Sequence, residues 1–194
     1  MTRKYELKKR AEQQEVTRQR IVEAAIDLHT SIGPIATTIS GIAERAGVQR
    51  QTVYRHFADD RELMLACSGL YEERHPMPDP GPLADVPDAT ARLRGAVELL
   101  YAYYEANEPM LTNVVRDAER DEVTREIAGT RYGPLLGRFG ELSAAAFSAR
   151  GRRRERLRAA IDVALSFRTW QALRGHGLTP EEAVEAAVGM ARCQ

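Results

Sequence analysis

The chain has 194 residues and is 43% hydrophobic, which is enough for a real core and allows one large domain or a small domain with a larger one. No apolar run reaches the length of a membrane span, and the amino end is polar and charged rather than a signal peptide. We therefore expect a cytoplasmic protein without a membrane partner.

The formal net charge is zero, but residues 1–57 carry 10 Lys/Arg against 6 Asp/Glu, and the rest carry 18 against 22. A mildly basic head on a mildly acidic body fits a protein that touches nucleic acid with one end, with chance asymmetry as the alternative.

The amino-terminal residues 1–15 are charged and lack apolar periodicity, which indicates a flexible arm or a frayed helix start. The basic run Lys8-Lys9-Arg10 can reach phosphates or the minor groove if a DNA-binding unit lies beside it; a solvated tail is the alternative. The first firm helix is expected from Thr17 and ends at Gly33-Pro34. Its expected buried face consists of Ile21, Ala25, Leu28 and Ile32.

The stretch from Thr37 to Phe57 carries the strongest pattern. Its first helix has an apolar face at helical spacing, made by Ile39, Ile42, Ala43 and Ala46. Thr38 can cap this helix, and Gly47 ends it where a left-handed residue is needed. A second short helix starts near Gln49 and buries Val53 and Phe57. The other side chains of that helix have no core to join and carry donors suited to bases and phosphates: Arg50, Gln51, Thr52, Tyr54, Arg55 and His56. The pair is a helix-turn-helix, which binds DNA in some proteins and is a plain packing unit in others.

This stretch resembles the DNA-binding head of the TetR family of transcriptional regulators. The matching residues are Thr37-Thr38, Ile42-Ala43, Ala46-Gly47-Val48, Thr52-Val53-Tyr54 and His56-Phe57, followed by Asp59 and Leu63. The resemblance covers about the first third of the chain and implies double-stranded DNA with a pseudo-palindromic operator as a partner. By match to the family motif, Arg50, Gln51 and Thr52 read bases. Tyr54, His56 and Thr38 contact phosphates, and Arg55 does either. Gln49 departs from the usual small hydroxyl cap, and acidic Asp60 stands where similar sequences carry a lysine.

Helical patterns fill the rest of the chain. Asp59 and Glu62 form a capping-box pattern that starts a fourth helix, which runs to about Arg74. Five of the nine prolines fall in residues 75–88, which predicts a loop. Further helices are expected over residues 90–106, 108–120, 121–130 (short and separate), 135–147 after a break at Gly133-Pro134, 152–174 and 180–192. Thr179-Pro180-Glu181-Glu182 is a complete start signal for the last of these helices.

The last two expected helices suggest a subunit interface. The helix over residues 152–174 is apolar on more than one side, so it needs more than one neighbour. The helix over residues 180–192 presents a smooth surface of small residues. In the TetR family the last two long helices pair with those of a second subunit, so the resemblance implies a homodimer. No strand pattern appears. We therefore predict an all-α protein of about nine helices, with an arm and three-helix DNA-binding domain at 1–58 and a helical ligand-binding and dimerisation domain at 59–194.

No catalytic constellation is present: there is no GxSxG, no phosphate-cradling Gly loop and no HExxH, and we predict neither an enzyme nor a cofactor. Cys67 and Cys193 lack metal-type spacing and are expected to be reduced thiols, and no two of the four histidines have ligand spacing on one helix, so no metal site is predicted. A set of aromatic and sulfur-containing residues has two interpretations, core packing or an apolar cavity for a small molecule. The set is Met64, Cys67, Tyr101, Tyr104, Met110, Phe139, Phe147, Phe167 and Trp170.

The sequence and the resemblance together predict a sequence-specific DNA-binding transcriptional regulator. By the resemblance it is a repressor that a small apolar ligand releases from its operator, the ligand acting through the fourth helix. The alternative is a dimeric small-molecule-binding or scaffold protein without specific operator recognition. An enzyme that uses the body cavity is a third class and would have to turn over its ligand.

Overall fold

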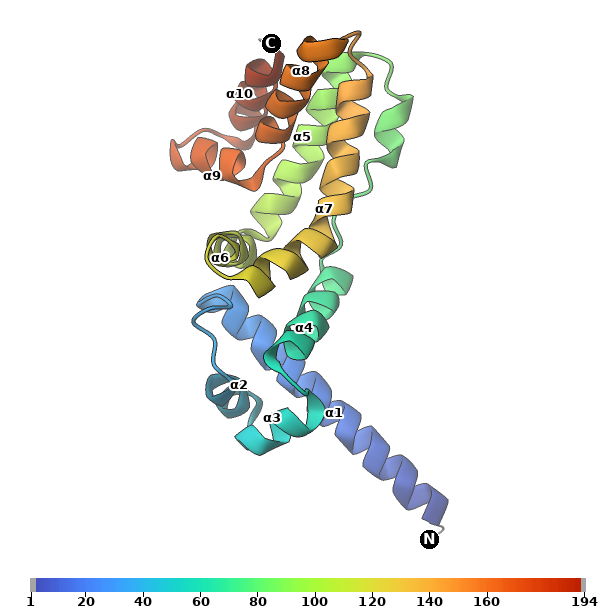
Figure 1. Cartoon of the computed structure of the whole chain (residues 1–194), viewed down its shortest axis with the longest axis vertical. Coiled ribbons are helices and arrows are strands. Elements are labelled where there is room, and N and C mark those ends of the chain that lie inside the picture. Colours follow the sequence, from blue (N-terminus) through green and yellow to red (C-terminus); the bar gives the residue numbers. More distant parts are fainter. Residues whose placement is uncertain (1–2, 193–194) are drawn as a thin grey trace. The chain divides into compact units, whose positions relative to one another are not determined.

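The computed structural model describes residues 3–192, which form ten α-helices and one 3-10 helix, with no β-strand among the residues described (Figure 1). The expected all-α class is confirmed, with a helix count close to nine. Two compact units divide the chain: residues 1–76 with 109–128, and residues 77–108 with 129–194. The first unit thus extends beyond residue 58, where the expected head ended. The expectation for Cys193 lies outside the described residues, whereas Cys67 is buried and forms no disulfide within the part of the chain that the structure describes.

The first unit contains α1 (Arg3–Ser31), α2 (Ile39–Ala46), α3 (Arg50–His56) and α4 (Asp60–Arg74). Most of α6 (Glu108–Ala118) and the first turns of α7 (Glu122–Ala145) complete it. The second unit contains the 3-10 helix η1 (Gly81–Asp85), α5 (Ala89–Ala106), the rest of α7, α8 (Gly151–Ala164), α9 (Phe167–Gly175) and α10 (Pro180–Arg192). Helix η1 forms inside the segment expected to be a loop. None of the described helices is both long and apolar enough to cross a lipid bilayer.

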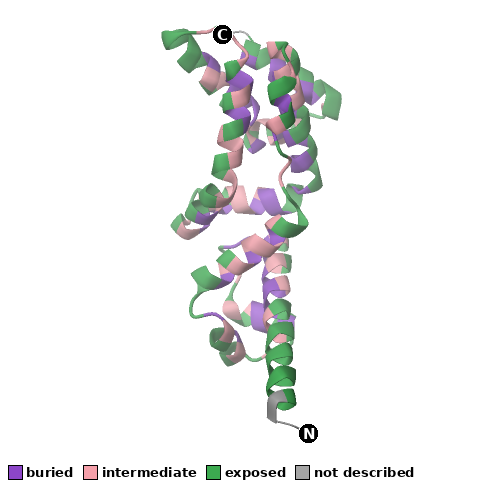
Figure 2. Cartoon of the chain, turned by 90° about the vertical axis from the view of Figure 1, so that its right-hand side faces the viewer, coloured by how far each residue is buried: buried purple, intermediate pink, exposed green. Residues whose placement is uncertain are grey.

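Helix α1 begins much earlier than the expected start at Thr17. Residues 5–16 are exposed on every side, so packing does not stabilise this half of the helix (Figure 2). Its Lys, Arg, Glu, Gln and Ala residues are good helix formers, and they extend a helix that the packed second half has already nucleated. Ile32 was expected on the buried face but is 45% exposed, because α1 ends at Ser31.

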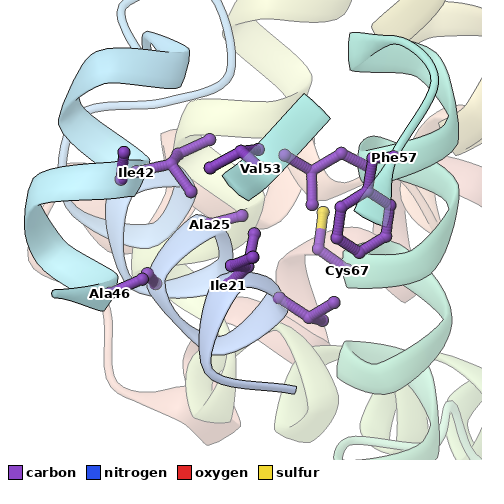
Figure 3. Packing of buried hydrophobic residues seen from close by; sticks show 11 residues of the cluster. Ile21, Ala25, Ile42, Ala46, Val53, Phe57 and Cys67 are labelled. Atoms are coloured by element: carbon purple, nitrogen blue, oxygen red, sulfur yellow. The ribbon is translucent and has the colours of Figure 1, made fainter. Parts of the chain in front are cut away.

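The core of the first unit is shared by α1, α2, α3 and α4 (Figure 3). Ile21 and Ala25 of α1 are fully buried and meet Ile42 of α2 in this core. The predicted anchors of α3 are confirmed, since Val53 is 1% and Phe57 is 2% exposed. Truncating a buried Phe to Ala costs about 3–5 kcal/mol, so these anchors hold α3 firmly on the unit.

Helix α10 packs against α5 and α8 of its own chain in the second unit. Ala183, Ala187 and Ala191 recur four residues apart on this side and are all fully buried. Their small side chains let the helix axes approach closely. These alanines, which were expected at the subunit interface, therefore pack against helices of their own subunit. Among the described large apolar side chains of α8 and α10, Val163 and Met190 are exposed, by 59% and 46%.

Two further expected helix boundaries are wrong. The break at Gly133-Pro134 does not occur, because α7 continues through Pro134. The proline removes one backbone hydrogen bond and costs about 3 kcal/mol, and buried Ile127 and Phe139 anchor the helix on either side. The single helix expected over residues 152–174 is instead α8 and α9. Ser166 separates them and caps α9, its hydroxyl accepting the Thr169 N–H at 3.1 Å.

Candidate nucleic-acid interface

The turn between α2 and α3 is built as the sequence predicts. The Thr38 hydroxyl accepts the Gly41 N–H at 3.0 Å and caps α2. Gly47 ends α2 with φ +64°, a left-handed conformation that suits glycine. Gln49 precedes α3 without a side-chain capping bond, in line with its departure from the usual cap. Thr38 is exposed and still has its own hydroxyl proton to donate, at a helix end that carries a partial positive charge.

Helix α3 presents its polar side chains away from the core. Val53 and Phe57 point inward, so the residues between them face solvent or the rim. Arg50, Gln51, Tyr54 and Arg55 are exposed, whereas Thr52 and His56 are half-buried. The Arg50 Nη2 donates a hydrogen bond to the Tyr54 hydroxyl at 3.2 Å. This hydrogen bond and the electrostatic interaction with Tyr54 raise the pKa of Arg50, with a smaller contribution from Asp60, and Arg50 is charged in any case.

His56 is a half-buried candidate for a DNA contact. Its Nε2 atom is buried and has no hydrogen bond to any described residue. Burial lowers the pKa of His56, and the positive charges of Arg55 and Arg18 lower it further, against a smaller opposing effect of Glu15. His56 is therefore neutral at pH 7, and a phosphate would meet a neutral ring rather than an imidazolium.

Several basic side chains of the first unit already have structural partners. Arg20 donates to the Ala46 carbonyl at the end of α2. Arg45 pairs with Asp27 of α1 at 2.9 Å, and Arg74 of α4 pairs with Glu23 of α1 at 2.7 Å. These contacts hold α2 and α4 on α1. Among the described basic residues of the helix-turn-helix, Arg50 and Arg55 are the two that α3 presents to solvent.

Three residues of α6, which the sequence did not single out, hold the turn between α1 and α2. The amide of Asn113 donates to the carbonyls of His29 and Thr30 at 3.2 and 2.7 Å, so it caps the end of α1. Arg116 donates to the Ile32 carbonyl at 3.0 Å.

Asp117, 3% exposed, accepts the Ile35 N–H at 2.9 Å and the Arg116 Nε–H at 2.7 Å. Charge-assisted hydrogen bonds of this kind are stronger than neutral ones, so α6 holds the turn that precedes α2 in a fixed position.

The residues proposed for a ligand cavity do not form one group. Met64, Cys67 and Met110 belong to the first unit, and the other six belong to the second. Cys67 is part of the head core, and Phe139 is fully buried. Trp170 lines a cavity of about 460 Å³ in the second unit together with Glu105, Glu108, Gln171, Arg174, Gly175, Gly177 and Leu178. Met64 lines a different cavity in the first unit.

Four of the predicted ligand residues, Tyr101, Tyr104, Phe167 and Trp170, form an aromatic cluster. Phe167 lies 5.5 Å from Tyr104 and 5.3 Å from Trp170, measured between ring centres. The Tyr101 and Tyr104 hydroxyls donate to the carbonyls of residues 164 and 165 at 2.8 and 2.7 Å, and burial raises the pKa of both phenols. The tyrosines thus satisfy the orphan carbonyls at the end of α8, so their polar atoms are already in use.

Comparison with known proteins supports the DNA-binding assignment for the head. Residues 21–67 match the family model of bacterial regulatory proteins, tetR family. The HTH-type transcriptional regulator SrpR of Pseudomonas putida is 39% identical over 70 residues, which are 36% of this chain and 32% of SrpR. The chain therefore aligns with about a third of this relative's length.

Solved structures extend the likeness to the fold of about nine-tenths of the chain. A TetR-like transcriptional regulator from Rhodococcus sp. RHA1 has a TM-score of 0.65 at 19% identity, over 91% of this chain and 93% of that one. FadR of Bacillus subtilis, solved in complex with stearoyl-CoA, has a TM-score of 0.54 at 15% identity, over 90% and 95%.

Proposed function

We propose that this chain, which belongs to the TetR family by its amino-terminal domain, is a sequence-specific DNA-binding transcriptional regulator that acts as a homodimer. The observation that carries the proposal is the state of α3. Two buried anchors fix the helix, and Arg50, Gln51, Tyr54 and Arg55 are left exposed on its outer side. Exposed donors on a fixed recognition helix suit the major groove, where Arg and Gln pair with base edges. Thr38, Thr52 and His56 complete the proposed contact set, and two heads on one dimer read a pseudo-palindrome.

Selection of DNA from a random pool by the purified protein tests this function. We expect enrichment of one pseudo-palindromic sequence whose half-sites are about one helical turn apart or somewhat more. The Arg50→Ala variant should lose that preference. Arg138→Ala, which removes an exposed charge from the second unit, is the matched control and should keep it. A pool that stays random would favour the alternative of a dimeric small-molecule-binding or scaffold protein.

We further propose that the protein is a repressor and that a small apolar ligand in the second unit releases it from DNA. The aromatic cluster supports an apolar ligand, and its member Trp170 lines a cavity of about 460 Å³. Most other side chains of that cavity are polar or charged, so Trp170 and Leu178 supply its apolar contacts. That volume lies within the usual range of about 300–1,000 Å³ for ligand sites. Trp170 is the only tryptophan, so its fluorescence reports binding directly. Ligand and DNA must weaken each other by the same factor. Compounds that quench Trp170 but leave operator affinity unchanged would contradict the coupling.

A further inference from the structure

A second cavity, of about 380 Å³, lies inside the first unit. The end of α1, the turn after it, and the first turns of α2, α4 and α7 surround it. Its apolar lining consists of Pro34, Ile35, Ile39, Ile42, Leu63, Met64 and Val123. The exposed members, Ile35, Asp60 and Arg61, mark the side that meets solvent. A cavity of this volume and apolar character has the features of a small-molecule site.

Most polar groups that line the cavity already have partners. The Thr37 hydroxyl donates to a carbonyl of its own turn at 2.8 Å. Thr124 donates to one oxygen of Asp121 at 2.7 Å, both through its hydroxyl and through its backbone N–H. Arg61 forms two bonds of 2.7 Å to the two carboxylate oxygens of Glu126, which neutralises its charge. The lining therefore has few donors to offer a ligand.

Asp60 is the exception among these polar groups. Its carboxylate makes no hydrogen bond or ion pair with any residue in the described range 3–192, and from a distance it slightly raises the pKa of Arg50. Asp59, not Asp60, caps α4, since Asp59 accepts the Glu62 N–H at 2.7 Å. With Arg61 neutralised, Asp60 and Asp121 leave the cavity negative. An apolar cavity with unpaired acceptors and negative charge favours a ligand that carries the opposite charge.

We propose that this cavity binds an organic cation, an apolar molecule of one or two rings that carries an ammonium group. The rings fill the space between Ile39, Leu63 and Val123, and the ammonium group pairs with Asp60. The site is separate from the Trp170 cavity of the second unit, and it does not depend on DNA binding. A molecule bound here contacts α2 and α4 directly, the helices that support the proposed recognition helix.

Calorimetric titration of the full chain with two matched probes tests the site. The probes are 1-naphthylmethylamine, a cation at pH 7, and 1-naphthalenemethanol, its neutral counterpart of nearly equal shape. We expect the amine to bind about fivefold more tightly than the alcohol, the effect of one partly screened charge pair. Asp60→Asn should reduce the amine to the affinity of the alcohol. Glu122→Gln removes a neighbouring exposed charge outside the lining and should leave the difference intact.

Two further variants show whether the probes occupy this cavity. Ile35→Trp places a large ring in the lining and should abolish binding of both probes. Ile32→Trp is the matched control, because Ile32 is similarly exposed in the same turn but does not line the cavity. Loss of binding in Ile35→Trp alone supports the site. Equal affinity of the two probes, or amine binding that survives both Asp60→Asn and Ile35→Trp, overturns it. Neither result depends on whether the protein selects an operator.

Discussion

The Arg50 guanidinium lies 5.5 Å from the centre of the Tyr54 ring and donates to its hydroxyl, so these two side chains of α3 are ordered together before DNA arrives. A guanidinium held over an aromatic ring loses less freedom on binding, which supports its proposed role in reading bases.

Substitutions of Arg50 and Tyr54 should have different effects on DNA binding. Arg50→Ala should cost about 1–3 kcal/mol on the selected operator and relax the preference at one or two base pairs. Tyr54→Phe keeps the ring beside Arg50 and removes the hydroxyl, so it should weaken operator and random duplex alike through the lost phosphate contact, because such contacts carry no sequence information. The loss of the Arg50 hydrogen bond should add only a small further decrease on the operator. Fluorescence anisotropy with both duplexes measures this. An unchanged selected sequence for Arg50→Ala would show that Arg50 does not read bases.

Asp60→Lys should tighten binding to any duplex. Asp60 is exposed in the first turn of α4, where its carboxylate is favoured by the helix end but repels a phosphate. The substitution should cost a few tenths of a kcal/mol in stability by thermal unfolding, with the Asp59 cap intact. If each head gains one phosphate contact, the slope of log K against log salt should steepen by about 0.9 per contact, so nearly 2 for a dimer. An unchanged slope and affinity would place Asp60 away from the DNA and direct attention to Lys8, Lys9 and Arg10.

Val163→Glu should separate the proposed dimer without unfolding the subunit. Val163 is 59% exposed on α8, so a carboxylate there disturbs a partner and not the core. Ala187→Glu should instead unfold the second unit, because Ala187 is fully buried against helices of its own chain. Sedimentation velocity reports the dimer, and circular dichroism reports the fold. Leu7→Glu, a similar change at a similarly exposed residue of α1, should affect neither. A dimer that persists in Val163→Glu would move the interface elsewhere.

His29 should make stability fall in mild acid. Burial lowers its pKa from 6.5 to about 4, against an opposing effect of Asp117. Between these two pH values the unfolded chain binds a proton that the folded chain does not. The contribution of neutral His29 to the free energy of unfolding is therefore complete above pH 6.5. It declines as the pH falls toward 4, by about 1.4 kcal/mol per pH unit. Urea unfolding of His29→Gln should show a shallower pH dependence than the unmodified protein. His176→Gln, at an exposed residue, should show the original one.

Gly33→Ala should destabilise the first unit. Gly33 has φ +94°, which a side chain adopts only with strain, and an added Cβ would lie 2.6 Å from the Asp117 Oδ2 atom. The expected cost is about 1–3 kcal/mol in chemical denaturation. Gly129→Ala is the matched control. It lies inside α7 with no atom within 4 Å of a new Cβ, and it should stabilise the protein by about 0.5–1 kcal/mol. If the two substitutions changed the stability equally, the hydrogen bonds from α6 would not hold the turn at Gly33 in a fixed position.

The sequence by itself determined the features of this protein that depend on neighbouring residues. The Thr38 cap, the left-handed Gly47, the Asp59 cap of α4 and the Thr179 start of α10 all follow from contacts over three or four residues. The anchors Val53 and Phe57 follow from helical spacing in the same way. Such local signals specify helices and their ends, and they were sufficient to predict the head.

Only the tertiary structure decided which residues far apart in the chain share a site. It showed that polar side chains of α6 form hydrogen bonds with the turn that follows Gly33. It also showed that Ala187 packs inside its own subunit. It also divided one apolar run into α8 and α9, because tyrosines of α5 satisfy the carbonyls at the break. Periodicity shows that a face is buried but not what buries it. The partner is set by packing between distant segments, and so are the cavities that those segments enclose.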